Sequence, residues 1–162
     1  MDEFASRHYP VKEHMRFQRR MWVVERVGWG VLGLIAVLGL TGLFGSGWLS
    51  RGTAAGNGLS IEYERFERAT RLSAFAFHFA PGATERTLHL NRGFQKNYQI
   101  SRIEPEPTRS QAEPDGFSLT FALPPEGGSV VLWAHARGYG IQRITARSDR
   151  APPLSFSTMI YP

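Results

Sequence analysis

The chain has 162 residues, of which 42% are hydrophobic and 20% charged, and its mean hydropathy is -0.26. These averages exclude a multi-pass membrane protein, a disordered chain and a collagen-like repeat, and the length leaves room for one modest domain. The absence of cysteine excludes disulfides, thiolate metal sites and cysteine nucleophiles. The net charge of +5 is too small and too evenly mixed to predict nucleic-acid binding.

Residues 1–26 form a basic leader, with six cations and four acidic residues. Pro10 marks a boundary, and residues 11–26 are compatible with a weakly amphipathic helix, so the leader is predicted to be partly helical. A basic helix of this kind would lie on an anionic inner leaflet. Docking to a cytoplasmic partner is one alternative, and a simple topology signal is another.

Residues 27–50 contain no charged residue over 24 positions, which as a helix exceeds the roughly 30 Å hydrocarbon core of a bilayer. Trp29 and Trp48 lie 19 residues apart and are predicted to anchor the segment at the two interfaces. The segment therefore predicts a single transmembrane helix. Because the cations lie upstream of it, we expect a cytoplasmic N-terminus and a periplasmic or other extracytoplasmic C-terminal domain, in an inner (plasma) membrane.

Two other interpretations of this segment remain open. A cleaved signal peptide has an apolar core of about 7–15 residues, shorter than this one, although Thr53-Ala54-Ala55 resembles a cleavage site. A buried core helix is disfavoured because the segment has no polar face. We favour an uncleaved anchor.

Small residues recur at every third position of the apolar segment. Successive steps of three spiral slowly around a helix, and we expect this surface to pack closely against a larger membrane protein or a second copy of the chain. The alternative is that glycine is simply common in membrane spans. The run from Gly28 to Gly33 matches GxGxxG, but no strand precedes it, so it does not predict a dinucleotide site. The predicted membrane-packing residues are Gly30, Gly33, Ala36, Gly39, Gly42 and Gly45.

Residues 51–58 are small and flexible and predict a linker, and residues 59–162 predict an outer β domain. About eight short runs with period-2 alternation, separated by turn residues, favour an all-β fold. We expect an immunoglobulin-like antiparallel sandwich of seven or eight strands, with a small barrel as the alternative. No helix is predicted here. The expected aromatic core residues are Phe75, Phe77, Phe79, Phe117, Phe121 and Trp133.

Glu104, Pro105, Glu106 and Pro107 form a strip in which two prolines fix an extended, non-pairing segment. A sandwich corner is the simpler interpretation, and contact with a partner is the functional one. Residues 108–116 are expected to form an exposed loop.

The sequence does not predict a reaction. His78, His89 and His135 lack the spacing of a metal site, and we predict no catalytic, metal-binding or cofactor-binding residue. Residues 63–68, YERFER, are expected to form a solvated, ion-paired strand face. A basic rim would face phospholipid headgroups or an acidic partner, although solvation is the simpler expectation. Its residues are Arg65, Arg68, Arg71, Arg143 and Arg147.

The layout of a basic leader, one glycine-rich span, YERFER, IEPEP and a terminal IYP resembles a group of uncharacterised single-pass proteobacterial membrane proteins with a small outer β domain. The resemblance implies association with YetF-like (DUF421) membrane proteins and an accessory role. It implies no catalytic residue. We therefore predict a membrane-anchored, non-enzymatic interaction module. The alternatives are a periplasmic domain that binds a ligand or envelope polymer through Trp133, Tyr139 and the 104–107 strip, and a metal-dependent enzyme centred on the histidines.

Overall fold

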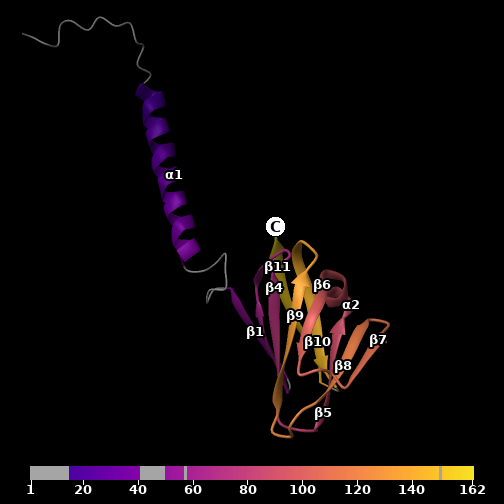
Figure 1. Ribbon diagram of the computed structural model, residues 1–162. Helices are drawn as coiled ribbons and strands as arrows, with labels where there is room; N and C mark the ends of the chain where they lie inside the picture. The colour runs from indigo at the N-terminus through magenta and orange to yellow at the C-terminus, as the bar shows by residue number, and fades with distance from the viewer. Residues whose placement is uncertain (1–14, 41–49, 57, 150) are drawn as a thin grey trace, which may run out of the picture. The chain divides into compact units, whose positions relative to one another are not determined.

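The computed structural model describes residues 15–40, 50–56, 58–149 and 151–162. It contains one long N-terminal helix and, as a separate compact unit, a β sandwich, each of which is described by itself (Figure 1). The helix, α1, is Met15–Leu40. It joins part of the predicted leader helix to the predicted span without a break.

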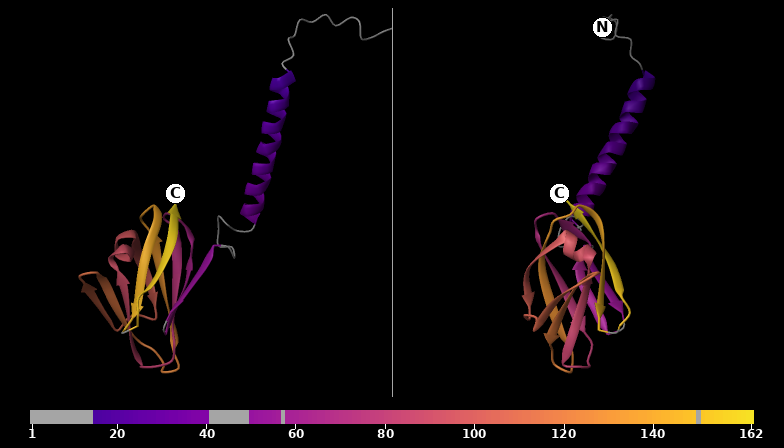
Figure 2. Two further views of the ribbon diagram at one scale, coloured as in Figure 1. Left: turned by 180° about the vertical axis from the view of Figure 1, so that it is seen from behind. Right: turned by 90° about the vertical axis from the view of Figure 1, so that its right-hand side faces the viewer.

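The sandwich consists of two sheets packed face to face (Figure 2). The strands are β1 (Arg51–Gly56), β2 (Leu59–Glu64), β3 (Phe66–Arg68), β4 (Leu72–Phe79), β5 (Glu85–Asn91), β6 (Tyr98–Glu104), β7 (Arg109–Glu113), β8 (Gly116–Ala122), β9 (Gly128–Ala136), β10 (Gly140–Ser148) and β11 (Leu154–Tyr161). One sheet has the order β1-β2-β4-β9-β6 and the other β3-β11-β10-β5-β8-β7. All pairs are antiparallel except β3 with β11. The predicted sandwich class is confirmed, although the described residues form eleven strands where seven or eight were expected.

The core is built by the predicted alternation. In β4, Phe75, Phe77 and Phe79 point inward and are at most 4% exposed, because successive side chains of a strand lie on opposite faces. The ring of Phe75 contacts Phe94 and Tyr98 edge-on, with ring centroids 5.3 and 5.1 Å apart. Phe75 also lies 6.3 Å, between ring centroids, from Phe156 of β11, so the aromatic cluster joins the two sheets. Edge-to-face contacts of this kind stabilise a core beyond the area they bury.

Four segments differ from the sequence predictions. The predicted linker at 51–58 is largely strand β1, because its backbone pairs with β2 over six positions even though its side chains are small. Strands β3 and β7 are short strands at the two edges of the second sheet. β7 occupies part of residues 108–116, which were expected to form a loop. The helix α2 (Arg92–Asn97) was not predicted. It begins where the Asn91 side chain accepts a hydrogen bond from the Phe94 N–H at 3.1 Å, and it buries Phe94 completely.

Two expected side-chain positions also need correction. Trp133 was expected in the core, but it lies half-exposed on the outer face of β9, because its inward neighbours are Leu132 and Ala134. Residues 63–68 do not form one solvated strand face. Strand β2 ends at Glu64, the chain moves to the other sheet after Arg65, and Glu67 is fully buried.

Candidate interaction surface

The predicted contact strip begins at the end of an edge strand. Glu104 is the last residue of β6 and lies opposite Val131 of β9. Pro105, Glu106 and Pro107 follow it and lead towards β7, and the Glu104–Pro105 peptide bond is cis. β6 is the last strand of its sheet and pairs only with β9. Its backbone N–H and C=O groups therefore point alternately towards β9 and away from the sheet. The strip therefore continues a free sheet edge.

Next to this edge, three side chains form an ordered group on the outer surface, which we call the β6 surface: Arg102, Glu104 and Trp133. Arg102 lies opposite Trp133, and its guanidinium carbon is 5.3 Å from the centroid of the indole ring. The guanidinium Nη2 also forms an ion pair with Glu104 Oε1. The arginine side chain remains 68% exposed. An exposed cation–π contact is worth about 0.5–1 kcal/mol, so the group orients its charges more than it stabilises the fold.

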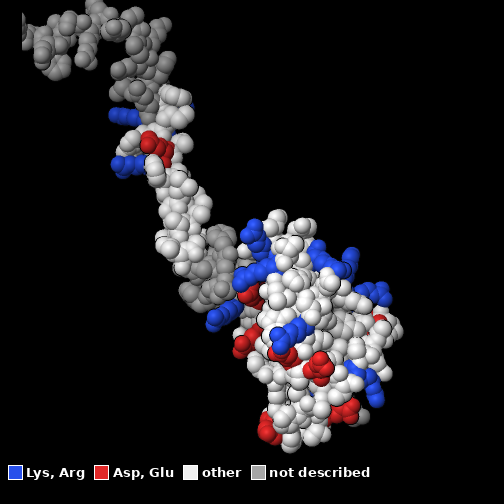
Figure 3. Space-filling model, in the orientation of Figure 1, with Lys and Arg blue, Asp and Glu red and all other residues white. Residues whose placement is uncertain are grey.

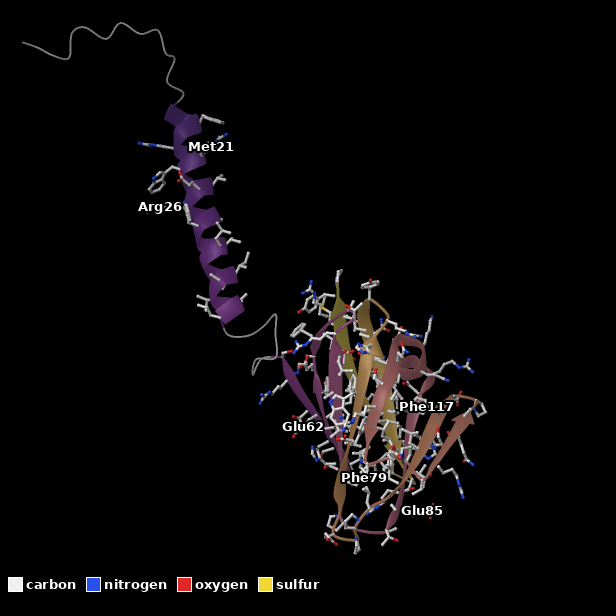
Figure 4. All side chains as sticks on the ribbon, in the orientation of Figure 1. Met21, Arg26, Glu62, Phe79, Glu85 and Phe117 are labelled. Carbon is white, nitrogen blue, oxygen red and sulfur yellow. The ribbon has the colours of Figure 1, made fainter. Side chains whose placement is uncertain are left out.

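Two hollows run along the free edge of β6. One has a volume of about 420 Å³ and includes Ile103, Glu106 and Pro107 in its lining. The other has a volume of about 340 Å³ and lies between β6, α2 and the β7–β8 hairpin, with Phe117 in its lining. Figure 4 labels Phe117 on this side of the sandwich. Ile100 lines both hollows, so they adjoin at this residue.

The three histidines of the sandwich do not come together. His89 Nδ1 lies 2.9 Å from Glu113 Oε1, His78 Nε2 lies 3.7 Å from Glu62 Oε1, and His135 Nδ1 lies 3.1 Å from the carbonyl oxygen of Thr70. Over the described residues, no group of three or more His, Asp or Glu side chains is arranged to hold a metal ion.

The His89–Glu113 pair lines a polar hollow of about 210 Å³ on the outer face of the other sheet. A hydrogen bond from Ser118, followed by the interaction with His89, holds the pKa of Glu113 below its usual value. Arg147, expected in the basic rim, lines this hollow instead. The carboxylate therefore orients the imidazole and keeps its own charge at neutral pH.

Glu67 is a buried ionisable group that the sequence analysis missed. Its carboxyl oxygens have no hydrogen-bond partner, and burial raises its pKa to about 7, with a smaller contribution from Glu64. Ser73 and Tyr98 face the carboxyl group and oppose this shift, although neither forms a well-aligned hydrogen bond with it. No sequence pattern marks its burial, because the alternation of β2 ends at Glu64 and β3 belongs to the other sheet.

The predicted membrane-packing residues Gly30, Gly33, Ala36 and Gly39 lie in α1, whereas Gly42 and Gly45 fall outside the described residues. Of the two predicted interface anchors, Trp29 lies in α1 and is 67% exposed, whereas Trp48 falls outside the described residues. Within α1, residues Arg19–Leu40 are long and apolar enough to cross a membrane, and none of the most apolar stretch is buried against the rest of the described structure.

No protein-family model matches the sequence, and no curated protein matches it. A solved structure with a similar arrangement is the cohesin module of a family 33 glycoside hydrolase from Clostridium perfringens, with a TM-score of 0.49 and 10% sequence identity. The alignment covers 67% of this chain and 98% of that module.

Proposed function

We propose that the protein is a membrane-anchored, non-enzymatic interaction module that acts beside a larger membrane protein. The observation that carries the proposal is the helix α1, whose Arg19–Leu40 stretch is apolar and uncovered while the sandwich encloses a complete core of its own. A helix that is apolar all round is stable only in a bilayer or against other helices. The cations upstream of the apolar segment favour a cytoplasmic N-terminus and an extracytoplasmic sandwich.

Anchoring is tested by placing one epitope tag at each end of the full chain and immunoblotting washed membrane fractions. An uncleaved anchor retains both tags on a single band in the membrane fraction after alkaline extraction. Loss of the N-terminal tag from the mature protein would show a cleaved signal peptide and overturn the anchor.

Two surfaces support a role in binding a partner. The small residues of α1, with Gly30, Gly33 and Gly39 among them, allow close approach of another membrane helix. On the sandwich, the β6 surface presents an oriented cation, a carboxylate and an indole beside a free strand edge. The resemblance of the sequence layout supports a YetF-like membrane protein as the partner, and a second copy of the chain is the alternative partner.

The partner is sought by purifying the full chain in mild detergent and identifying stoichiometric companions by mass spectrometry. Gly39→Leu is expected to weaken recovery of the companion severalfold, whereas Val37→Leu, a matched change beside it on the same helix, is expected to have little effect. Arg102→Glu tests the β6 surface, with Arg147→Glu on the other sheet as its control. A monomer that co-purifies with no companion and does not self-associate would contradict the proposal.

A second candidate function is binding of a small ligand or an envelope polymer. The half-exposed ring of Trp133 favours it, since an indole offers a flat face for stacking on a sugar or ring. Glu104 and Trp133 both belong to the β6 surface, whereas Tyr139 lies in the connection between β9 and β10. Co-sedimentation with purified cell-wall polymer, lost in Trp133→Ala and kept in Tyr139→Ala, would support this function.

A further inference from the structure

The exposed large hydrophobic side chains of the sandwich are concentrated at one end. Among the described residues of this unit they are Leu72, Tyr139, Ile141 and Met159. β4 and β10 begin at this end, and β11 finishes there. Single exposed hydrophobic residues are common on protein surfaces, but a cluster at one end marks a contact surface.

Three of the side chains at this end form a continuous row, which we call the apolar row: Phe66, Met159 and Ile141. Met159 lies directly opposite Phe66 in the β3–β11 pair and directly opposite Ile141 in the β10–β11 pair. All three point away from the core, because residues an odd number of positions apart in a strand face opposite sides. Glu67 and Ile160, next to Phe66 and Met159, are buried, and so is Ile144, three positions from Ile141. Met159 is 44% exposed and Ile141 is 75% exposed. The row therefore crosses three adjacent strands on the solvent side of the sheet.

Cations border the apolar row on both sides. Arg68 lies opposite Tyr161 on one side of the row, and Arg143 lies opposite Ser157 on the other. Arg65 and Arg71 are also exposed near this end, and none of these four forms an ion pair with a described residue. On the face visible in Figure 3, most cationic side chains gather towards this end of the sandwich and most acidic ones towards the other.

The chain enters the sandwich at this same end. Ser50 is fully buried, and its carbonyl oxygen accepts a hydrogen bond from the Arg65 N–H at 2.6 Å. Its hydroxyl donates to the carbonyl oxygen of Phe66 at 3.4 Å. Nine residues separate Leu40 from Ser50, which limits the distance between them to roughly 35 Å even if fully extended. Phe66, at one end of the apolar row, is therefore hydrogen-bonded to Ser50, the last residue of the uncharged segment 27–50.

We propose that the apolar row, together with Tyr139 and the bordering arginines, docks on the surface of the bilayer that α1 spans, with anionic phospholipid headgroups as its ligand. This inference rests on the proposed anchoring. An aromatic ring and short apolar side chains suit the headgroup level of a bilayer, and arginines bind the phosphates there. Attachment through Ser50 raises the local lipid concentration, so a surface with a low intrinsic affinity for lipid is enough for docking.

The absence of cysteine in the natural sequence allows a direct test. Single cysteines are introduced in the full chain as Met159→Cys, Ile141→Cys and, as a control, Ser155→Cys. Ser155 is exposed on the same face of the same strand as Met159, four residues or about 13 Å further from the docking end. Each variant carries an environment-sensitive fluorophore and is reconstituted into vesicles that contain phosphatidylcholine with a headgroup-level spin-label quencher, with or without phosphatidylglycerol.

We expect strong quenching at positions 159 and 141 in vesicles that contain phosphatidylglycerol, and little quenching at 155. Each cation that faces an anionic leaflet changes the ratio of docked to undocked domains about fivefold. Arg68→Glu and Arg143→Glu should each reduce the quenching accordingly, and 1 M salt should reduce it further. Arg147→Glu, in the polar hollow, serves as the control for a charge change elsewhere.

The outcomes separate this inference from the proposed function. If the protein floats with the vesicles but all three positions are equally unquenched, the anchor holds and the docking surface is wrong. If positions 159 and 141 become shielded only after a protein partner is added, the row is a protein interface and the lipid proposal is overturned. If the full chain fails to enter the bilayer, both proposals fall.

Discussion

Glu67 and Tyr98 face each other inside the sandwich, although β3 and β6 belong to different sheets. Burial raises the pKa of both groups, and the charge of Glu67 adds to the effect on Tyr98. The tyrosine hydroxyl already shares a 2.7 Å hydrogen bond with the hydroxyl of Thr158. The carboxyl group is therefore buried beside polar groups without a hydrogen-bond partner, and this environment favours its neutral form.

The burial of Glu67 predicts that its contribution to the stability of the sandwich falls as pH rises. The pKa of Glu67 is about 7 when folded and about 4.5 when exposed, so the contribution of Glu67 to the free energy of unfolding is fully present below pH 4.5 and is lost between pH 4.5 and 7. A shift of this size corresponds to a loss of about 3 kcal/mol. Pulse proteolysis in urea, applied to the full chain in detergent at several pH values, measures the unfolded fraction.

Glu67→Gln should remove this part of the pH dependence and stabilise the sandwich at pH 8, because the amide is neutral at every pH. Glu126→Gln, an exposed change in a turn, is the matched control and should leave the profile unchanged. A Glu67→Gln profile that still falls between pH 4.5 and 7 would show that another group is responsible.

Sequence alternation alone could predict most of the sandwich. It correctly placed Phe75, Phe77 and Phe79 in the core, because a period of two is a direct consequence of strand geometry. It could not predict β1, whose order comes from six backbone pairings with β2 and not from apolar side chains. The six-residue α2 is too short to show a helical period, and only Asn91 as its cap indicates where it begins.

Less of the candidate site could be predicted from the sequence. The strip around Glu104 could be recognised from its prolines, but Arg102 and Trp133 meet only through the β6–β9 register, which contains a bulge after Ile100. The same limit applies to the apolar row. Phe66, Ile141 and Met159 are far apart in the sequence, and only the parallel pairing of β3 with β11 brings the first beside the other two.

Gly116→Ala is expected to destabilise the sandwich by about 2–3 kcal/mol. Its backbone has φ +153°, and a Cβ would lie 1.9 Å from the carbonyl oxygen of Leu90, which is backbone and cannot turn away. Gly82→Ala is the control, because the nearest atoms there belong to the flexible Arg86 side chain. Equal urea midpoints for the two variants would contradict this expectation.

Asn91→Ala is expected to cost about 1 kcal/mol, since the first turn of α2 loses its cap. The effect should appear as faster amide hydrogen exchange at Phe94, because the N–H of Phe94 donates a hydrogen bond to the Asn91 side chain. Gln95→Ala, an exposed change in the same helix, should leave that exchange rate near the original value. Unchanged exchange at Phe94 in Asn91→Ala would show that tertiary packing alone holds the helix.

Glu113 predicts the opposite response to acid from that of Glu67. Its folded pKa lies below the usual value, so the stability it contributes is present above about pH 4.5 and is lost as pH falls through the lowered pKa. Ser118→Ala removes the largest cause of the shift and should raise the pKa of Glu113, as measured by NMR titration of its side-chain carbon. Ser129→Ala, on the other sheet, should leave that pKa unchanged.

The position of β11 has a consequence for the order of folding. It lies between β3 and β10, and residues Met159–Tyr161 pair with Phe66–Arg68, more than 90 residues earlier in the chain. Its sheet therefore stays incomplete until residue 161 has been synthesised, and contacts so distant in sequence form slowly. A chain threaded through a membrane in extended form would remain unfolded during its passage. Closure of the sandwich would then occur only on the far side, once its last strand had crossed.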